Sequence, residues 1–406
     1  MNNSQGATPI SFLLVCHSYP PVIGGSELEA QRICAALIRR GYRVTVVCAG
    51  GKPMPPLRDW IDPEGVNVRI YAGRWKGILK DIVFALRVSG MLIWERRNYQ
   101  FVYFLMQGLH LAAGLPTARL LGKPILMKIA GSGVVPLMAK SLSGRLELRW
   151  LRKWAYRVMI LNDGMREEAM AAGFASNHLH WMPNPIDTAH FAPFEETKRK
   201  ELRRKLGIPP AATATIYCGR LAAGKGLPEL IDAFAMVVQQ VPEALLLIVG
   251  DGPLRPELAM QATQLQLKDD KVRFVGQVGP AEVCNWLNVA DVFALVSFSE
   301  GFPCALAEAM STGLPCVVSD IPANRQLIDD GKQGFLAPAG DPEATSVAIA
   351  RLFKDVSLRL RLGEAARQRI VDNYTSDKVS DRYETLFRQM LSEVEPKVGM
   401  LSNNRN

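Results

Sequence analysis

Short apolar runs alternate with longer amphipathic stretches through the first half of the chain. Between two such runs, at residues 10–16 and 43–49, apolar positions recur at helical spacing from residue 26 to residue 40, and the pattern stops at Gly41, a residue type that commonly ends a helix. Strands that alternate with helices predict a parallel sheet covered on both faces. Four further strand-length runs follow, at residues 66–71, 101–106, 124–130 and 158–161.

The alternation restarts after a proline-punctuated stretch without any period, Pro-Asn-Pro-Ile-Asp-Thr-Ala-His-Phe-Ala-Pro at residues 183–193. We therefore predict an α/β fold of two Rossmann-like, doubly wound parallel-sheet domains that face a cleft, with ligands at the carboxyl ends of the strands. The pattern from residue 341 on is helical. The strands of the second region are predicted at residues 214–218, 245–249, 272–275, 289–296 and 315–319.

These two regions set the predicted domain boundaries. The first domain covers residues 1–190 and the second covers residues 191–375, a division that suits a chain of 406 residues. A final helix over about residues 376–395 is expected to pack back on the first domain, and residues 396–406 are expected to form a disordered tail.

Composition favours a cytoplasmic protein. Residues 1–9 are polar and no basic flank precedes the first apolar run, so nothing there resembles a secretory signal. The longest apolar region, residues 78–94, contains Lys80, Asp81 and Arg87 and fails as a membrane span. The seven cysteines show no metal-ligand spacing, which indicates buried free thiols in a reducing compartment.

The net charge of +9 is concentrated in the first half of the chain. Residues 1–190 hold 23 Lys and Arg against 12 Asp and Glu, so the remainder is slightly acidic. A cationic first domain suits an anionic partner such as a membrane surface, a lipid diphosphate or a nucleic acid. The alternative is a basic surface that only aids solubility, and no nucleic-acid-binding module is recognisable, so we expect no nucleic acid partner.

A glycine-rich segment with two cations follows the first strand of the second domain. It reads Cys-Gly-Arg-Leu-Ala-Ala-Gly-Lys-Gly over residues 218–226 and leads into a helix. Its glycines, the free N–H groups of the helix N-terminus and the charges of Arg220 and Lys225 together suit a diphosphate. The segment also fits the start of a P-loop, but Gly226 lacks the hydroxyl that such a loop needs for magnesium.

Two carboxylates stand eight residues apart after a later strand, in Ser-Glu-Gly-Phe-Pro-Cys-Ala-Leu-Ala-Glu-Ala-Met at residues 299–310. Pro303 suits the first position of a helix, which places Glu300 in the loop and Glu308 in the second turn. Carboxylates accept hydrogen bonds from diols, so both suit the hydroxyl groups of one ligand. The alternative is a solvated Glu300 and a Glu308 that only stabilises its helix.

Two weaker glycine motifs lie at other predicted strand ends. Tyr-Pro-Pro-Val-Ile-Gly-Gly-Ser-Glu at residues 19–27 puts Gly24 and Gly25 at a helix start, where the backbone can approach an anion. Val-Gly-Asp-Gly-Pro at residues 249–253 includes Asp251 in a turn. Each motif also reads as an ordinary tight turn.

Taken together, these motifs resemble those of the GT4 family of retaining glycosyltransferases, which have the GT-B fold. The family's order is kept across nearly the whole chain, including Pro-Asn-Pro-Ile-Asp at residues 183–187, which resembles the interdomain segment, and Ser-Thr-Gly-Leu-Pro at residues 311–315. The resemblance makes the first domain the acceptor side and the second domain the nucleotide-sugar-binding side.

The resemblance also implies a role for each motif residue. Arg220 and Lys225 would hold the donor's diphosphate, Glu300 the hydroxyls of the transferred sugar and Glu308 those of the ribose; the first three are the expected catalytic residues. Members generally need no metal, and the chain has no Asp-x-Asp motif, so we expect no metal or cofactor beyond the nucleotide-sugar co-substrate. The other residues implied in donor binding are Gly24, Gly25, Gly219, Asp251, Gly276, Gln277, Gly301, Phe302 and Pro303.

The sequence departs from the family in two places. Many relatives carry His-Gly where this chain reads Lys-Ile-Ala-Gly-Ser-Gly at residues 128–133, and Cys304 stands where Asn is common. His110, at the preceding strand end, is a candidate substitute with Gly131 and Ser132 on the acceptor and sugar side, although a lone His at a helix start is commonly structural. We assign no catalytic base, because a leaving diphosphate that takes the acceptor proton would need none.

The predicted helix at residues 145–157 carries Trp150 and Trp154 on one face among basic residues. Such a helix suits a membrane interface, and residues 74–97 have a similar character. The alternative is an ordinary helix with its tryptophans in the core. We expect peripheral attachment to the inner face of the membrane and a lipid-linked acceptor.

The leading interpretation is a retaining, metal-independent hexosyltransferase. It would move a sugar from a nucleotide-diphosphate sugar to a glycan or lipid-linked acceptor in cell-surface polysaccharide biosynthesis. Among the possible donors, a UDP-sugar is the favoured one. The alternatives are a non-catalytic nucleotide-sugar-binding protein, a sugar-nucleotide epimerase or phosphorylase of the same fold, and a P-loop ATPase.

Overall fold

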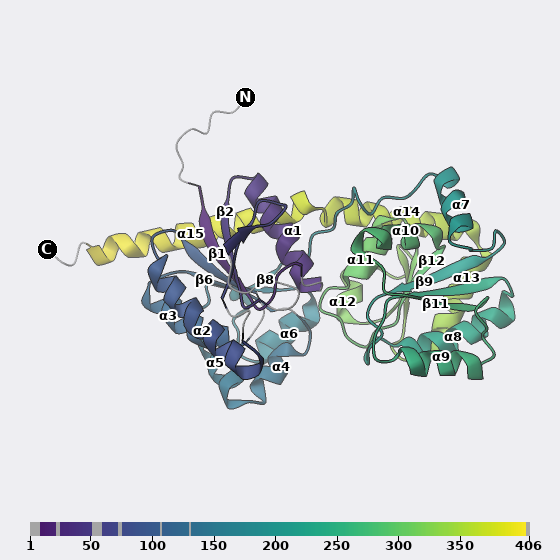
Figure 1. Ribbon diagram of the computed structural model, residues 1–406, viewed down its shortest axis with the longest axis horizontal. Coiled ribbons are helices and arrows are strands. Elements are labelled where there is room, and N and C mark those ends of the chain that lie inside the picture. Colours follow the sequence, from purple (N-terminus) through teal and green to yellow (C-terminus); the bar gives the residue numbers. More distant parts are fainter. Residues whose placement is uncertain are drawn as a thin grey trace, which may run out of the picture. The chain divides into compact units, whose positions relative to one another are not determined.

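The computed structural model describes residues 9–21, 25–50, 59–71, 75–105, 108–129 and 131–402. It divides into two compact units, Met1–Pro185 with Ser376–Asn406 (unit 1) and Ile186–Thr375 (unit 2), coloured along the chain in Figure 1. The chain first crosses from unit 1 to unit 2 after Pro185, five residues before the predicted boundary at 190. Ile186 already belongs to unit 2, because it forms a bridge with Thr375 and its amide donates to the Tyr374 carbonyl at 2.8 Å.

Within the described residues, unit 1 is built on an eight-stranded sheet in the order β3-β4-β2-β1-β5-β6-β7-β8. Pairing is parallel except between β3 and β4. The short strands β3 and β8 were not predicted. The strands are β1 (Ser11–Cys16), β2 (Arg43–Cys48), β3 (Asp59–Ile61), β4 (Asn67–Ile70), β5 (Phe101–Leu105), β6 (Ile125–Lys128), β7 (Arg157–Ile160) and β8 (Leu179–Trp181).

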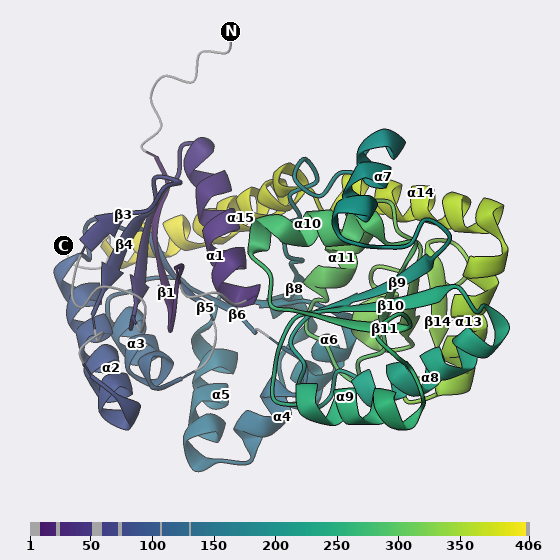
Figure 2. The same cartoon turned by 45° about the vertical axis from the view of Figure 1, so that its right-hand side comes forward.

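Helices cover both faces of this sheet, as the alternating pattern predicted. Helices α1 and α15 lie on one face, and α2 and α3 lie on the other (Figure 2). Two helix starts have side-chain caps, from Ser141 before α5 and Asn162 before α6. The helices are α1 (Gly25–Arg39), α2 (Gly77–Trp94), α3 (Leu109–Leu120), α4 (Val134–Ala139), α5 (Leu142–Trp154), α6 (Asp163–Ala171), the 3-10 turn η1 (Ser176–His178) and α15 (Ser376–Ser402).

The C-terminal helix α15 completes the core of unit 1. Tyr383 and Phe387 are buried, and the Phe387 ring lies 5.3 Å from Phe12 and 4.8 Å from Phe101, centroid to centroid. Where we expected a disordered tail from residue 396, the helix continues to Ser402. Residues 403–406 lie outside the described part of the chain.

Unit 2 holds a parallel sheet whose six described strands run in the order β11-β10-β9-β12-β13-β14. The predicted strand at 289–296 is shorter in the structure, because helix α10 continues to Val289, and β14 was not predicted. The strands are β9 (Thr213–Cys218), β10 (Ala244–Val249), β11 (Val272–Gly276), β12 (Val292–Leu295), β13 (Cys316–Ser319) and β14 (Gly334–Ala337).

Helices also cover both faces of the unit 2 sheet, with α8 and α9 on one side and α10 and α11 on the other (Figures 1 and 2). Two doubly wound sheets confirm the predicted fold class. The helices of unit 2 are α7 (Glu196–Lys205), α8 (Leu227–Gln240), α9 (Arg255–Gln264), α10 (Pro280–Val289), α11 (Cys304–Ser311), α12 (Pro322–Arg325), α13 (Pro342–Lys354) and α14 (Val356–Asn373).

Each sheet reverses its strand order beside its first strand. In unit 1 the reversal lies between β1 and β5, and in unit 2 it lies between β9 and β12. In open parallel sheets of this kind, the carboxyl ends of the two strands at the reversal leave a crevice where ligands bind. The loops that follow these four strands are therefore where functional side chains are to be sought.

We predict that α15 is part of the folding unit and not an appendage. Phe387→Ala should reduce the free energy of unfolding by about 3–5 kcal/mol, because it leaves a cavity among aromatic rings. Gln389→Ala, an exposed change on the same helix, should alter it by less than about 0.5 kcal/mol. Urea unfolding of both variants checks this, and equal effects would contradict it.

Candidate functional site

Three loops of unit 2 are joined by their backbones at the carboxyl edge of the sheet. The Gly219 amide donates to the Val249 carbonyl at 3.0 Å, and the Gly250 amide donates to the Gly276 carbonyl at 2.8 Å. The Leu221 amide donates to the Asp251 carbonyl at 3.0 Å. The ends of β9, β10 and β11 are thus one connected platform, and its predicted site residues Gly219, Asp251 and Gly276 lie side by side.

Two glycines make this platform sterically possible. A Cβ at Gly250 would lie 1.9 Å from the Gly219 carbonyl oxygen, and a Cβ at Gly226 would lie 2.0 Å from the Val296 carbonyl oxygen. Both have positive φ, +132° and +66°. A Ser or Thr at position 226, which a P-loop requires, would collide with the end of β12, so the P-loop interpretation fails on geometry.

The reversal between β9 and β12 brings Lys225 and Glu300 together. The Lys225 Nζ lies 2.8 Å from the Glu300 Oε1, although 75 residues separate them in the chain. A backbone bond from the Phe298 amide to the Gly224 carbonyl, at 2.9 Å, fixes the two loops against each other. Glu300 is largely buried, whereas Lys225 keeps about a third of its side chain exposed. Arg220, in the same loop, is exposed.

Glu308 lies on α11, the helix that follows the Glu300 loop. The helix begins at Cys304 with Pro303 as its N-cap, one residue later than predicted, and Glu308 is still in its second turn. Burial and then the charge of Glu308 raise the pKa of the Cys218 thiol, which places Glu308 next to the end of β9. Gly301 and the buried Phe302 connect Glu300 to this helix, and Phe302 packs on the Tyr374 ring.

Two further predicted donor residues, Asp251 and Gln277, have exposed side chains. Gln277 follows β11 and is exposed. The Asp251 carboxylate accepts a bond from the Gly252 amide at 2.7 Å and lies 3.4 Å from Arg255 Nη1, so it shapes its own turn. Both residues lie on the same edge of the sheet as Lys225, at the ends of β10 and β11.

In unit 1, the reversal between β1 and β5 gathers a second group of polar side chains. His17 follows β1 directly, and its imidazole lies 3.8 Å from Asp81 and 3.5 Å from the Lys80 ammonium, both on α2. Burial and then the charge of Lys80 lower the pKa of His17. Sequence reasoning missed His17; the rule that ligands bind at the carboxyl ends of strands would have found it.

The other candidates of unit 1 lie at the same edge. His110, in the first turn of α3, is only 2% exposed, and burial followed by His17 lowers its pKa to about 4. After β6, Ser132 Oγ accepts from Asn162 at 3.4 Å, and the next amide, that of Gly133, donates to Glu168 at 2.9 Å; Gly131 is half-buried. Gly25 begins α1, whereas Gly24 lies outside the described residues.

Comparison with known proteins decides what this arrangement is. Residues 24–185 match the family described as the glycosyl transferase 4-like domain, and residues 198–369 match glycosyl transferases group 1. The chain belongs to the GT4 group 1 glycosyltransferases. The two matched regions fall on unit 1 and unit 2 in turn, so the enzyme is a hexosyltransferase that carries both halves of the family.

Two curated relatives of this glycosyltransferase span different shares of it. It is 30% identical over 193 residues to the N-acetyl-alpha-D-glucosaminyl L-malate synthase of Bacillus anthracis, which is 48% of this chain and half of that protein. It is 26% identical over 384 residues to the UDP-Gal:alpha-D-GlcNAc-diphosphoundecaprenol alpha-1,3-galactosyltransferase of Escherichia coli, which is 91% of this chain and 95% of that protein. The E. coli relative is named for a UDP-sugar donor and a lipid-linked acceptor, whereas the B. anthracis relative is named for an L-malate product.

Solved structures show the same GT-B fold. The Anabaena protein HepE in complex with UDP-glucose matches with a TM-score of 0.77 at 20% identity, over 93% of this chain and all of that one. WaaG, a glycosyltransferase involved in lipopolysaccharide biosynthesis, matches with a TM-score of 0.70 at 18% identity, over 91% of this chain and 98% of that one. These likenesses confirm the fold predicted from the motifs.

A buried ion pair that the sequence did not reveal lies beside the departure from the family pattern. Lys128, the last residue of β6, is completely buried and bonded to Glu29 of α1 and, at 2.9 Å, to the Asn184 side chain. Burial lowers the pKa of Lys128, but the charges of Glu29 and Tyr383 and the hydrogen bonds to them together outweigh it, and the net shift is upward. Tyr383 of α15 also interacts with this lysine. A buried charge must be paired in this way to be tolerated.

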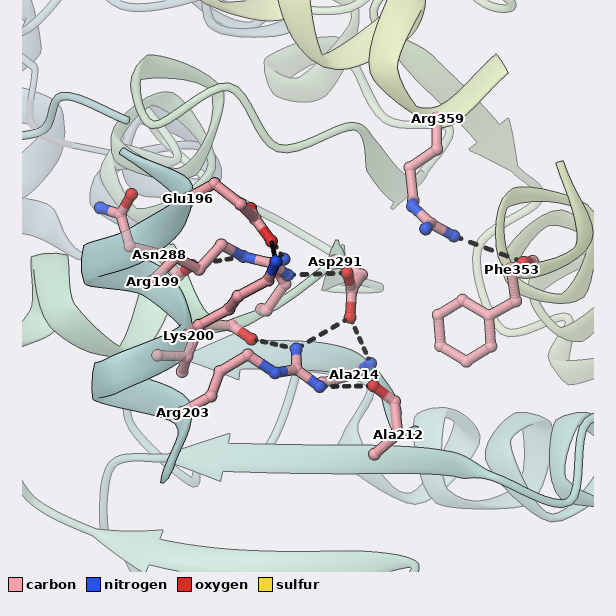
Figure 3. Close-up of polar contacts among 12 residues, drawn as sticks. Glu196, Arg199, Lys200, Arg203, Ala212, Ala214, Asn288, Asp291, Phe353 and Arg359 are labelled. Atoms are coloured by element: carbon pink, nitrogen blue, oxygen red, sulfur yellow. Dashed lines mark hydrogen bonds and ion pairs between the residues drawn. The ribbon is translucent and has the colours of Figure 1, made fainter. Parts of the chain in front are cut away.

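A cationic cavity of about 730 Å³ in the transferase lies at the other edge of the unit 2 sheet. Figure 3 shows Arg199 and Arg203 of α7 converging on Asp291, at 2.7 and 3.3 Å. Asp291 precedes β12 and accepts the Ala214 amide at 2.8 Å, while Arg203 also donates to the Val289 carbonyl. These arginines hold α7 to the amino ends of β9 and β12, so we assign them to structure.

We predict that His110 makes the stability of the enzyme depend on pH. Its pKa is about 6.5 in an unfolded chain and about 4 in the fold, so protons bind the unfolded state first and stability falls as pH drops below about 6.5. The loss should reach about 2 kcal/mol near pH 5. His110→Gln should lack this component.

Urea unfolding of the wild type and His110→Gln at neutral pH and near pH 5 measures the difference. Other titrating groups are common to both proteins and cancel. Parallel pH profiles would contradict the burial of a neutral His110.

Proposed function

We propose that this enzyme transfers a hexose from a UDP-sugar to a lipid-linked glycan, with retention of configuration and without a metal, in the assembly of a cell-surface polysaccharide. The observation that carries the proposal is the Lys225–Glu300 pair at the strand reversal of unit 2, set in a glycine platform. A cation for the diphosphate and a carboxylate for the sugar hydroxyls stand 2.8 Å apart, as a donor that joins both groups requires.

The choice of uridine rests on relatives. The E. coli relative is named for UDP-Gal, and HepE has been solved with UDP and with UDP-glucose. Glu308, beside the end of β9, supports a nucleotide with ribose hydroxyls at that position. Among the donor classes predicted from sequence, UDP-sugars therefore come first.

The choice of a lipid-linked acceptor rests on one relative and on charge. The E. coli relative is named for a diphosphoundecaprenol acceptor, and it matches this chain along 95% of its length. The positive charge of residues 1–190 favours an acceptor that carries a diphosphate. The acceptor would approach the carboxyl edge of unit 1, where His17, Lys80 and Asp81 lie.

In the transfer, the bond between the anomeric carbon and the diphosphate oxygen breaks, and the acceptor oxygen bonds to the same face of that carbon. Arg220 and Lys225 stabilise the negative charge that develops on the leaving diphosphate, in the manner of an electrostatic clamp. The acceptor proton passes to the leaving diphosphate, so no side chain need act as a base. Glu300 holds the sugar hydroxyls, which requires Lys225 to exchange its carboxylate partner for phosphate.

We predict that Lys225→Ala lowers kcat by about 10²–10³, because it removes charge stabilisation from the transition state. Glu300→Gln should lower kcat as well. The loss of kcat in the double variant Lys225→Ala with Glu300→Gln should be smaller than the two single losses combined, since the two side chains contact each other. Sugar transfer followed by mass spectrometry measures this, with Lys268→Ala, an exposed lysine of unit 2, as the matched control. Full activity in Lys225→Ala would refute the assignment.

The donor and the metal requirement are tested together by thermal shift. We expect UDP-sugars to raise the melting temperature more than GDP- or ADP-sugars do, equally in EDTA and in magnesium, and the shift to disappear in Lys225→Ala. A ligand at 100 times its Kd stabilises by about 2.7 kcal/mol, which is readily detected. A shift with ATP and magnesium alone would overturn the proposal, and an inverted anomeric product by NMR would remove its retaining part.

A further inference from the structure

Helix α2 has apolar side chains on two faces, and the fold of unit 1 buries only one. The second face consists of side chains that follow one another at helical spacing along its length, and we call it the α2 stripe. Their exposed fractions lie between 44% and 68%. The buried face is formed by Phe84, Ala85, Val88, Met91 and Leu92. The α2 stripe is formed by Leu79, Ile82, Leu86 and Ile93 of the helix together with Trp75, which precedes the N-cap residue Lys76.

Such a face is unusual for a helix that only covers a sheet. The outward side of a surface helix is ordinarily polar, and contiguous exposed apolar patches mark interaction sites. Two more exposed side chains, Ile78 at 72% and Trp94 at 85%, flank the α2 stripe and widen it. No helix in the described part of the chain is both long and apolar enough to cross a bilayer.

Positive charge surrounds the α2 stripe. Lys76 and Arg87 lie along one side by helical spacing, Arg96 and Arg97 follow its C-terminal end, and all four are exposed. The two nearby carboxylates do not face the α2 stripe as free charges. Asp81 lies by helical spacing on the side of the buried Ala85 and Val88, and Glu95 binds Arg69 at 2.9 Å. Apolar contact and excess positive charge therefore coincide on one surface.

We propose that the α2 stripe docks the enzyme on an anionic lipid bilayer, with α2 lying in the plane of the headgroups. Apolar residues enter the acyl boundary in that arrangement, while lysines and arginines meet anionic headgroups. Trp94 is the last residue of α2 and Trp75 precedes the helix by two residues, and tryptophan prefers the membrane interface. Only the reason for membrane docking, access to a lipid-linked acceptor, rests on the proposed function.

The position of α2 in unit 1 fits that purpose. The helix begins at the carboxyl edge of the sheet, and its residues Lys80 and Asp81 contact His17 at the end of β1. A lipid diphosphate held at the headgroup level would thus reach the polar cluster at the strand reversal from the N-terminal end of the α2 stripe. The α2 stripe and the residues Lys80 and Asp81, which contact His17, thus belong to the same helix.

The helix predicted from sequence to bind membranes, α5, fits the role less well. Trp150 and Trp154 are half-buried and stack on each other at 5.3 Å. Arg152 donates to the Ala172 carbonyl, and Arg157, the first residue of β7 after α5, pairs with Glu393 of α15. Other cations of α5 remain exposed, so it is the longer exposed apolar face, and not the number of charges, that favours α2.

A second copy of the chain is the competing occupant. A symmetric contact through the α2 stripe would bring Lys76 and Arg87 of two copies toward each other, and Asp81 could not offset them, because helical spacing places it on the opposite side of α2. Like charges at such a contact oppose association. An anionic bilayer has no such conflict.

Co-sedimentation of the full chain with mixed phosphatidylcholine–phosphatidylglycerol vesicles tests the proposal. The wild type should bind at low ionic strength, and binding should weaken in high salt or with pure phosphatidylcholine. The exposed changes Leu86→Ser with Ile93→Ser should weaken binding about tenfold. The matched change in unit 2, Val356→Ser with Leu360→Ser, replaces equally exposed side chains and should bind as the wild type does.

Three results would overturn the assignment to α2. They are absence of wild-type binding at low salt, undiminished binding by Leu86→Ser with Ile93→Ser, and loss of binding in Arg149→Glu with Lys153→Glu of α5 while the α2 variant binds fully. Concentration-dependent self-association that the α2 variant abolishes, without vesicle binding, would assign the surface to a second copy. The UDP-sugar thermal shift, measured on the same variants, reports the donor site separately, so either proposal can fail alone.

Discussion

Backbone contact between loops at the carboxyl edge of the unit 2 sheet is the constraint on which the donor site depends. Gly250 lies against the Gly219 carbonyl and Gly226 against the Val296 carbonyl, at distances that no side chain would allow. A Cβ at either position would push β9's loop away from its neighbour and would carry Lys225 away from Glu300 with it. Since catalytic geometry tolerates shifts of well under an ångström, these glycines fix chemistry as well as shape.

The fold, and the position of the glycine and glutamate loops at one edge of the unit 2 sheet, could be predicted because their signals are local. The strand-length apolar runs, the glycines and the two glutamates can each be recognised within about a dozen residues of sequence. The parallel topology then places the glycines and the glutamates at one edge of the sheet. The contact between Lys225 and Glu300 follows from that topology once the strand order is known. The sequence did not predict the short strands β3 and β8, because pairing with other strands decides whether they form. It also did not predict that α15 continues to Ser402, because this depends on propagation of the helix.

The Lys128 cluster shows where sequence reasoning ends. A lysine at a strand end suggests a solvated charge or a phosphate ligand, and nothing nearby in the chain indicates otherwise. Its burial becomes evident only when Glu29, Asn184 and Tyr383 converge from segments up to 354 residues apart. Asn184 directly precedes the first crossing into unit 2, and Tyr383 follows the second crossing on α15. The ion pair thus anchors both connections to the core of unit 1, and loss of one partner would leave an uncompensated buried charge.

Charge in the donor loops is arranged by position and not by amount. Arg220 and Lys225 carry two positive charges, and Glu300 and Glu308 carry two negative ones. The net charge of these four side chains is therefore zero and cannot by itself attract a diphosphate. In the proposed function the attraction comes from placement, with both cations and the amides at the start of α8 directed to the diphosphate and the carboxylates to hydroxyl groups. Before the donor arrives, Lys225 and Glu300 neutralise each other at 2.8 Å, which spares each the cost of burial alone. In the proposed function, a donor that offers phosphate and hydroxyls together binds both groups at once. A bare diphosphate or a bare sugar would bind only one of them, and this difference is a physical basis for selecting the intact nucleotide sugar.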